Sequence, residues 1–144
     1  MRVDQIVLRE IRLALKEPFR ISSGEIRERR ILLLELTDAS GARAWSECVA
    51  GEAPNYSPET IDTAWPTTIA HVAPRVLGHT FDHPGEAHAL LERDFRGHQM
   101  AKAGVEMGLW GLAATLADEA LSRFIGGTRP QIAVGISLGI QASP

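Results

Sequence analysis

The chain has 144 residues, of which 44% are hydrophobic and 23% charged, and its formal net charge is −3. These values are typical of a soluble globular domain of ordinary size, and they give no basic footprint for binding nucleic acid. No apolar run reaches the roughly 18 residues that a membrane span needs. The single cysteine, Cys48, excludes an internal disulfide framework and favours a cytoplasmic location.

The first third of the chain predicts an antiparallel sheet. Residues 6–15 alternate between apolar and polar side chains, and residues 31–37 and 42–48 are the next two strand-like segments. Residues 16–25 contain a proline and a glycine that interrupt the pattern, so they predict a loop. Residues 38–41 predict a tight turn that ends on glycine. Short connections favour a three-stranded meander.

Helical patterns follow the meander. Ser57 is the expected N-cap of a helix over residues 58–72, in which Pro66 should kink the helix or break its hydrogen bonding. A short helix is expected over residues 84–95. Residues 96–127 predict one long helix with a short second turn behind it. The long helix is apolar on most of its circumference, so we expect it to lie between two layers.

Two features of the last third point to close neighbours. Gly104, Gly108 and Gly111 each cost roughly 1 kcal/mol relative to alanine inside a helix, so another backbone should pass close to this helix. Residues 131–140, QIAVGISLGI, are apolar and nearly uncharged, which predicts a strand buried on both faces, as in a parallel sheet. Such a strand needs parallel neighbours, and only a few residues follow it.

Short motifs spread over the whole chain carry a family resemblance. They are Pro18-Phe19 with Ser22 and Gly24, Glu47-Cys48-Val49 with Ala53-Pro54, Tyr56-Ser57-Pro58-Glu59, Arg96-Gly97 with Met100-Ala101-Lys102, Glu106-Met107 with Leu109-Trp110, Gly126-Gly127-Thr128, and Val134-Gly135 with Ser137-Leu138-Gly139-Ile140-Gln141. In this order and spacing they resemble the N-terminal capping domain of the enolase superfamily. The resemblance is strongest to the branch of o-succinylbenzoate synthases and N-acylamino acid racemases.

The resemblance implies an α+β fold in which a three-stranded antiparallel meander and a helical bundle form a capping domain over residues 1–127. Residues 128–144 would begin a (β/α) barrel. The implied enzyme is a homo-oligomer that abstracts the proton next to a carboxylate, with Mg²⁺ and two lysines in the barrel. Neither Lys16 nor Lys102 matches a barrel lysine, so the resemblance places no catalytic residue and no metal ligand here. We therefore expect an inactive fragment or a truncated sequence.

The resemblance also implies which residues face a small-molecule carboxylate substrate. Phe19 and Ser22 would lie in a flap that closes over it, Gly51 and Tyr56 would shape its pocket, and Ser137 would lie at the end of the first barrel strand. Simpler interpretations stay open for each: a solvent-exposed connection for the flap, a hydrophobic staple for Tyr56, and a hydroxyl bonded to backbone for Ser137.

Four other polar residues have plainer interpretations. Cys48 is expected to be a buried structural thiol, and Glu52 to be solvated or paired with an arginine. Lys102 and Glu106, four residues apart, are expected to pair on the helix surface.

Two further functions remain open at this level. The first is another reaction of the same superfamily, such as dipeptide epimerisation or muconate-cycloisomerase-like chemistry. The second is a stand-alone, non-catalytic module that binds a partner through the apolar tail and the face of the long helix.

Overall fold

The computed structural model of the chain describes residues 1–21 and 24–136. Strands β1 (Val3–Ile21), β2 (Gly24–Asp38) and β3 (Arg43–Cys48) form one antiparallel sheet in the order β1-β2-β3. The predicted meander is therefore confirmed. The inward-facing leucines of β2 are fully buried, because they alternate with residues on the opposite face of the sheet.

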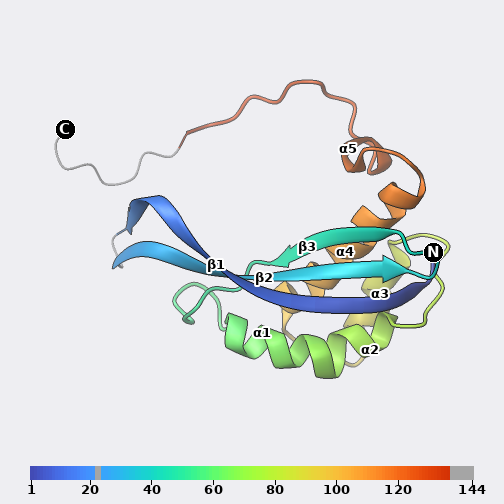
Figure 1. Ribbon diagram of the computed structural model, residues 1–144, viewed down its shortest axis with the longest axis horizontal. Coiled ribbons are helices and arrows are strands. Elements are labelled where there is room, and N and C mark those ends of the chain that lie inside the picture. The colour runs from blue at the N-terminus through green and yellow to red at the C-terminus, as the bar shows by residue number, and fades with distance from the viewer. Residues whose placement is uncertain (22–23, 137–144) are drawn as a thin grey trace.

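Strands β1 and β2 form a hairpin that extends well beyond β3 (Figure 1). The prediction of a loop over residues 16–25 was wrong, because cross-strand pairing resumes at Phe19 and continues to the hairpin end. Residues 15–18 of β1 lie opposite Arg27 alone, so the ladder is interrupted there. Pro18 belongs to this unpaired stretch, as expected for a residue without a backbone N–H.

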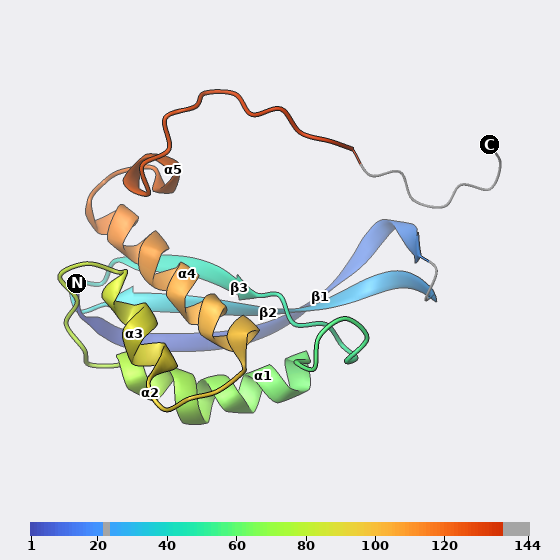
Figure 2. The ribbon, with the colours of Figure 1, turned by 180° about the vertical axis from the view of Figure 1, so that it is seen from behind.

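Helices cover one face of the sheet (Figures 1 and 2). They are α1 (Ile61–Thr67), the π-helical turn η1 (Thr68–Val72), α2 (Ala73–Val76), α3 (Glu86–Glu92), α4 (Gln99–Leu116) and α5 (Leu121–Phe124). The expected long helix and short second turn are confirmed as α4 and α5. Pro66 lies inside α1, and the helix widens into η1 directly after this turn. Within the described ranges, no helix has the length and apolar character to cross a membrane.

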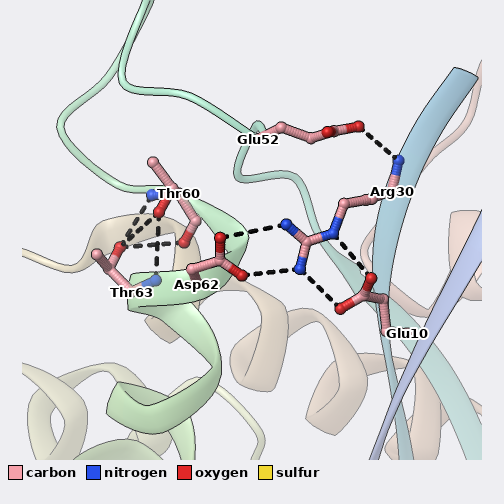
Figure 3. Close-up of polar contacts among 6 residues, drawn as sticks. All are labelled: Glu10, Arg30, Glu52, Thr60, Asp62 and Thr63. Carbon is pink, nitrogen blue, oxygen red and sulfur yellow. Dashed lines mark hydrogen bonds and ion pairs between the residues drawn. The ribbon is translucent and has the colours of Figure 1, made fainter.

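The start of α1 differs from the prediction. Thr60, not Ser57, is the N-cap, and its hydroxyl and backbone exchange hydrogen bonds with Thr63 in a capping box (Figure 3). The Ser57 hydroxyl instead accepts a hydrogen bond from the backbone N–H of Glu59 at 3.0 Å. Both residues are good caps, but Thr60 has a reciprocating partner three residues later and Ser57 does not.

Glu59 stabilises a different helix from the one that its sequence position suggests. Its carboxylate accepts hydrogen bonds from the backbone N–H groups of Met100 at 2.9 Å and Ala101 at 3.1 Å. The N-cap residue of α4, His98, provides no side-chain cap of its own. A negative charge at this end also complements the helix dipole, so Glu59 both caps α4 and ties it to the loop before α1.

Helix α4 packs closely on the sheet through its glycines, as predicted. An added Cβ at Gly104 would lie 3.2 Å from Cys48 Cβ, and one at Gly108 would lie 2.5 Å from Leu36 Cδ1. The Ser46 hydroxyl donates a hydrogen bond to the Gly104 carbonyl at 2.6 Å. Cys48 is a buried free thiol, as expected, and burial raises its pKa. Helix α4 also contacts α1, η1 and α3, but α1 itself contacts β2, so the expectation that α4 lies between two layers stays a prediction.

Lys102 is buried, and the prediction that it pairs with Glu106 on the surface was wrong. Its Nζ donates to Glu92 Oε1 at 3.0 Å and to the Phe95 carbonyl at 2.6 Å, and it lies 4.6 Å from the centre of the Phe95 ring. Lys102 lies on the side of α4 that faces α3, so its ammonium group links α4 to α3. The hydrogen bond from Lys102 lowers the pKa of Glu92. Glu106 instead lies 3.5 Å from His88 Nδ1.

The apolar tail does not form the expected strand where it is described. Residues 131–136 have no strand structure, and the rest of the predicted segment, 137–140, lies outside the described residues. Among the described residues the tail has no parallel strand to pair with, and its apolar side chains are between 73% and 87% exposed: Ile132, Val134 and Ile136.

The glycines of α4 give opposite predictions at two positions. Gly108→Ala should destabilise the chain by about 1–2 kcal/mol, because the new methyl clashes with fully buried Leu36, and this exceeds the gain in helix propensity. Gly111→Ala should stabilise it by up to about 1 kcal/mol, because its Cβ would lie an ordinary 3.4 Å from Ala44 Cβ. Urea unfolding followed by circular dichroism measures both. A stabilising Gly108→Ala would refute the close approach.

Candidate functional site

Two segments extend from the same end of the molecule and lie side by side in both ribbon views (Figures 1 and 2). One is the far end of the β1–β2 hairpin, and the other is the loop of residues 49–60, which we call the cap loop. The hairpin carries Phe19, and the cap loop carries Gly51 and Tyr56, so three of the predicted site residues belong to this end. The other two, Ser22 and Ser137, lie outside the described residues.

The predicted aromatic residues are open to solvent. Phe19 is 52% exposed and Tyr56 is 97% exposed. A hydrophobic staple needs a packed side chain, so that interpretation of Tyr56 was wrong. Phe19 pairs across the hairpin with Ile26, which is 41% exposed. Phe19 and Ile26 thus leave apolar surface uncovered on the hairpin, and Tyr56 does so on the cap loop.

The cap loop has a fixed base. Gly51 and Thr60 form a parallel β-bridge, and the backbone N–H of Ile61 donates to the Gly51 carbonyl at 2.8 Å. The loop leaves and re-enters the body of the domain at nearly the same place, which is the arrangement of a compact Ω-type loop. Its tip can therefore move without disturbing the start of α1.

Arg30 joins the hairpin to the cap loop and to α1 (Figure 3). Its guanidinium donates to both carboxylate oxygens of Glu10 at 2.8 and 2.9 Å, and to both oxygens of Asp62 at 3.2 and 2.7 Å. Its backbone N–H donates to Glu52 at 3.2 Å. These hydrogen bonds lower the pKa values of Glu10 and Asp62 and raise that of Arg30. We call this group the Arg30 clamp.

The sequence contains a signal for the clamp in the residue spacing of the second strand. Arg30 belongs to the charged run before the second strand and resembles a solvated face. However, Arg30 precedes Leu32 and Leu34 at a spacing of two, so it continues the series that faces the helices. Its side chain is only 16% exposed. Glu52 is exposed, as expected, but its described partner is the backbone N–H of Arg30 and not an arginine side chain.

Ion pairs join the two strands of the hairpin beyond the clamp. Arg20 binds Glu25 at 2.6 Å and Arg12 binds Glu28 at 3.1 Å, each pair joining β1 to β2. The hydrogen bond from Arg20 lowers the pKa of Glu25. Glu25 and Glu28 are thus paired, whereas Lys16, Glu17 and Arg29 are exposed and lie outside the ion pairs of the described residues, so the hairpin offers both charged and apolar groups to a ligand.

A shallow apolar groove lies between β3, α4 and α5. It has a volume of about 580 Å³ and is lined by Trp45, Ser46, Glu47, Val49, Met107, Trp110, Gly111, Leu121 and Ile125. Several of its large side chains are about half exposed, including Trp45 at 52% and Met107 at 46%. Its lining is mostly apolar, so it suits packing against another surface better than chemistry.

The described side chains do not fit a divalent metal. Over residues 1–21 and 24–136, no three or more His, Cys, Asp or Glu side chains come together in a way that could hold an ion. Three carboxylates of the hairpin and the start of α1, Glu10, Glu25 and Asp62, are each bonded to an arginine instead.

Comparison with known proteins gives a consistent family. The profile of the mandelate racemase / muconate lactonizing enzyme N-terminal domain matches residues 3–126. The o-succinylbenzoate synthase of Bacillus subtilis is 34% identical over 140 residues, and the N-succinylamino acid racemase of Thermus thermophilus is 38% identical over 143. These alignments cover 97% and 99% of this chain but only 38% of each relative.

Solved structures give the same result. An enolase-superfamily protein from Listeria innocua is 30% identical, with a TM-score of 0.90, over 99% of this chain and 38% of its own. A dipeptide epimerase from Cytophaga hutchinsonii, complexed with Mg and the dipeptide D-Ala-L-Val, is 25% identical, with a TM-score of 0.79, over 91% and 35% respectively. The predicted enolase N-terminal-domain fold is confirmed.

The Arg30 clamp predicts a dependence of stability on pH. The folded pKa values of Glu10 and Asp62 lie below their ordinary 4.5 and 3.8, so the stability that they contribute is present above those values and is lost as pH falls through the lowered ones. Arg30→Met should lower the urea midpoint at pH 7 and have a smaller effect near about pH 3. Arg29→Met, at an exposed position of the same strand outside the clamp, should keep the wild-type slope. Equal slopes for all three proteins would contradict this.

Proposed function

Because the chain belongs to the mandelate racemase / muconate lactonizing enzyme N-terminal domain family, we propose that it is the capping domain of an enolase-superfamily enzyme. The enzyme abstracts the proton α to a carboxylate, as an o-succinylbenzoate synthase, an N-acylamino acid racemase or both. The chain spans about 38% of the length of the curated relatives that it matches. The acid–base groups and the metal ligands then belong to a barrel domain that acts with it.

One observation carries this proposal: the hairpin and the cap loop extend from the same end of the domain, with apolar side chains that nothing described covers. Such a pair of segments can close over a substrate, hold the part remote from its carboxylate, and exclude water from the reacting atoms. Mg²⁺ held by the barrel supplies charge stabilisation at the substrate carboxylate. The described residues of this chain bind and shield, and they transfer no proton.

The proposal also assigns boundaries and contacts. The capping domain spans residues 1–127, and residues 128–144 begin the barrel. The groove between β3, α4 and α5 packs against that barrel, which would cover its exposed tryptophan and methionine. The residues that face the substrate are Phe19, Ser22, Gly51, Tyr56 and Ser137.

The activity is tested with the enzyme that contains this chain. We expect exchange of the α-proton of N-succinylamino acids in D₂O, followed by proton NMR, and dehydration to o-succinylbenzoate, followed by absorbance. The 144-residue chain alone should show neither. Turnover of dipeptides alone would favour epimerisation instead, and a folded, Mg²⁺-loaded enzyme that turns over none of these carboxylates would refute the proposal.

Tyr56 provides the variant that tests the cap loop. Tyr56→Ala should lower kcat/KM by roughly tenfold, mainly through KM, because it removes apolar contact with the bound substrate. Its effect on the free energy of unfolding should be small, since the side chain is 97% exposed. Leu77→Ala is the control, because Leu77 is 40% exposed and follows α2, a helix that lies away from the hairpin (Figure 1). Equal kinetics for the two variants would remove Tyr56 from the site.

A further inference from the structure

We propose that Arg30 is a positioning residue that fixes the spacing between the hairpin and the cap loop. Through that spacing it sets the selectivity of the enzyme for the part of the substrate remote from the reacting carboxylate. The statement about selectivity rests on the proposed function, whereas the statement about spacing rests on the geometry of this chain alone.

The clamp joins three segments at one point: the β1–β2 hairpin, the start of α1 and the cap loop. Glu10 belongs to β1, Arg30 to β2 and Asp62 to the first turn of α1, while Glu52 belongs to the cap loop (Figure 3). Arg30 pairs in register with Arg12, at the place where the hairpin leaves the part of the sheet that β3 covers. The base of the hairpin is thus bound to both ends of the cap loop, through Glu52 on one side and α1 on the other.

The geometry of the clamp distinguishes it from an ordinary surface ion pair. Exposed single pairs contribute little, because the two side chains must lose freedom to hold one arrangement. Here the planar guanidinium meets each of two carboxylates with two hydrogen bonds, which fixes direction as well as distance. A lysine could supply the charge but not this fork, so Arg30→Lys is not a conservative change at this position.

The position of the clamp along the hairpin separates a fixed part from a part that can close. The unpaired residues 15–18 lie between the clamp and the hairpin end that carries Phe19. The ladder is interrupted there, so bending costs fewer hydrogen bonds than elsewhere in the strands. Arg30 therefore defines the fixed end from which the flap moves, and its loss should let the whole hairpin shift relative to Tyr56.

The first test measures spacing without any substrate. Spin labels are placed on the chain at Ile26→Cys and Asn55→Cys; native Cys48 is only 2% exposed, so labelling is confined to the introduced cysteines. Electron–electron distance measurement should give a broader or shifted distribution with Arg30→Met and with Arg30→Lys. Arg12→Met, which removes a cross-strand pair of the same hairpin, should leave it unchanged. An unchanged distribution with Arg30→Met overturns the inference.

The second test compares two substrates of the enzyme that contains this chain. The ratio of kcat/KM for the N-succinyl and N-acetyl forms of one amino acid should change by roughly tenfold with Arg30→Met, mainly through KM, because small displacements of binding groups are costly. Arg30→Lys should fail to restore the ratio, and Arg12→Met should preserve it.

The outcomes separate the two proposals. Equal losses for both substrates with Arg30→Met, at an unchanged ratio, would show a structural role only and would overturn the claim about selectivity. If the wild-type enzyme turns over neither substrate, the proposed function and the claim about selectivity fail together, and the distance measurement alone decides the claim about spacing.

Discussion

The close contact between α4 and the sheet is the constraint on which the rest of the domain depends. Glycine at positions 104 and 108 lets the helix backbone approach the buried leucines of β2, and the Ser46 hydroxyl fixes this approach through the Gly104 carbonyl. With α4 held in place, Lys102 can bind Glu92 and the Phe95 carbonyl, which attaches α3. A bulkier helix face would move α4 outward, and the polar contacts at its N-terminus would move with it.

The same contact determines where the cap loop lies. Glu59 accepts hydrogen bonds from the first N–H groups of α4, so the end of the loop is bound to a helix that is itself bound to the sheet. Gly51 closes the base of the loop on Ile61, and the Arg30 clamp attaches that base to the hairpin. The domain thus holds the loop at three points and leaves its tip, with Tyr56, free of packing. Rigid support with an open tip suits binding of a ligand that must enter and leave.

The alternation of apolar residues was sufficient to predict the sheet order, because that order follows from local patterns and short connections. Helical periodicity and glycine spacing were sufficient to predict α4 and its close contact with the sheet. Several of the failures share a physical cause, which is that the deciding partner belongs to another helix, strand or connection, whereas the N-cap of α1 was decided locally by the Thr60–Thr63 capping box. Lys102 is buried because α3 packs beside it, and Glu59 caps α4 rather than its own helix. The segment with Pro18 is strand because β2 pairs with it again after the interruption. Ser22 and Ser137 lie outside the described residues and stay predictions.

Four carboxylates of the domain are held in the ionised form by arginines. A general base or acid works best with a pKa near the working pH, which for a carboxyl group requires an upward shift. In Glu10, Glu25, Glu35 and Asp62 the hydrogen bond from an arginine lowers the pKa instead. Burial raises the pKa of Cys48, and that thiol packs under α4. The four carboxylates keep fixed charges that hold strands and loops in register, which supports the proposed role of a domain that encloses a reaction rather than carrying it out.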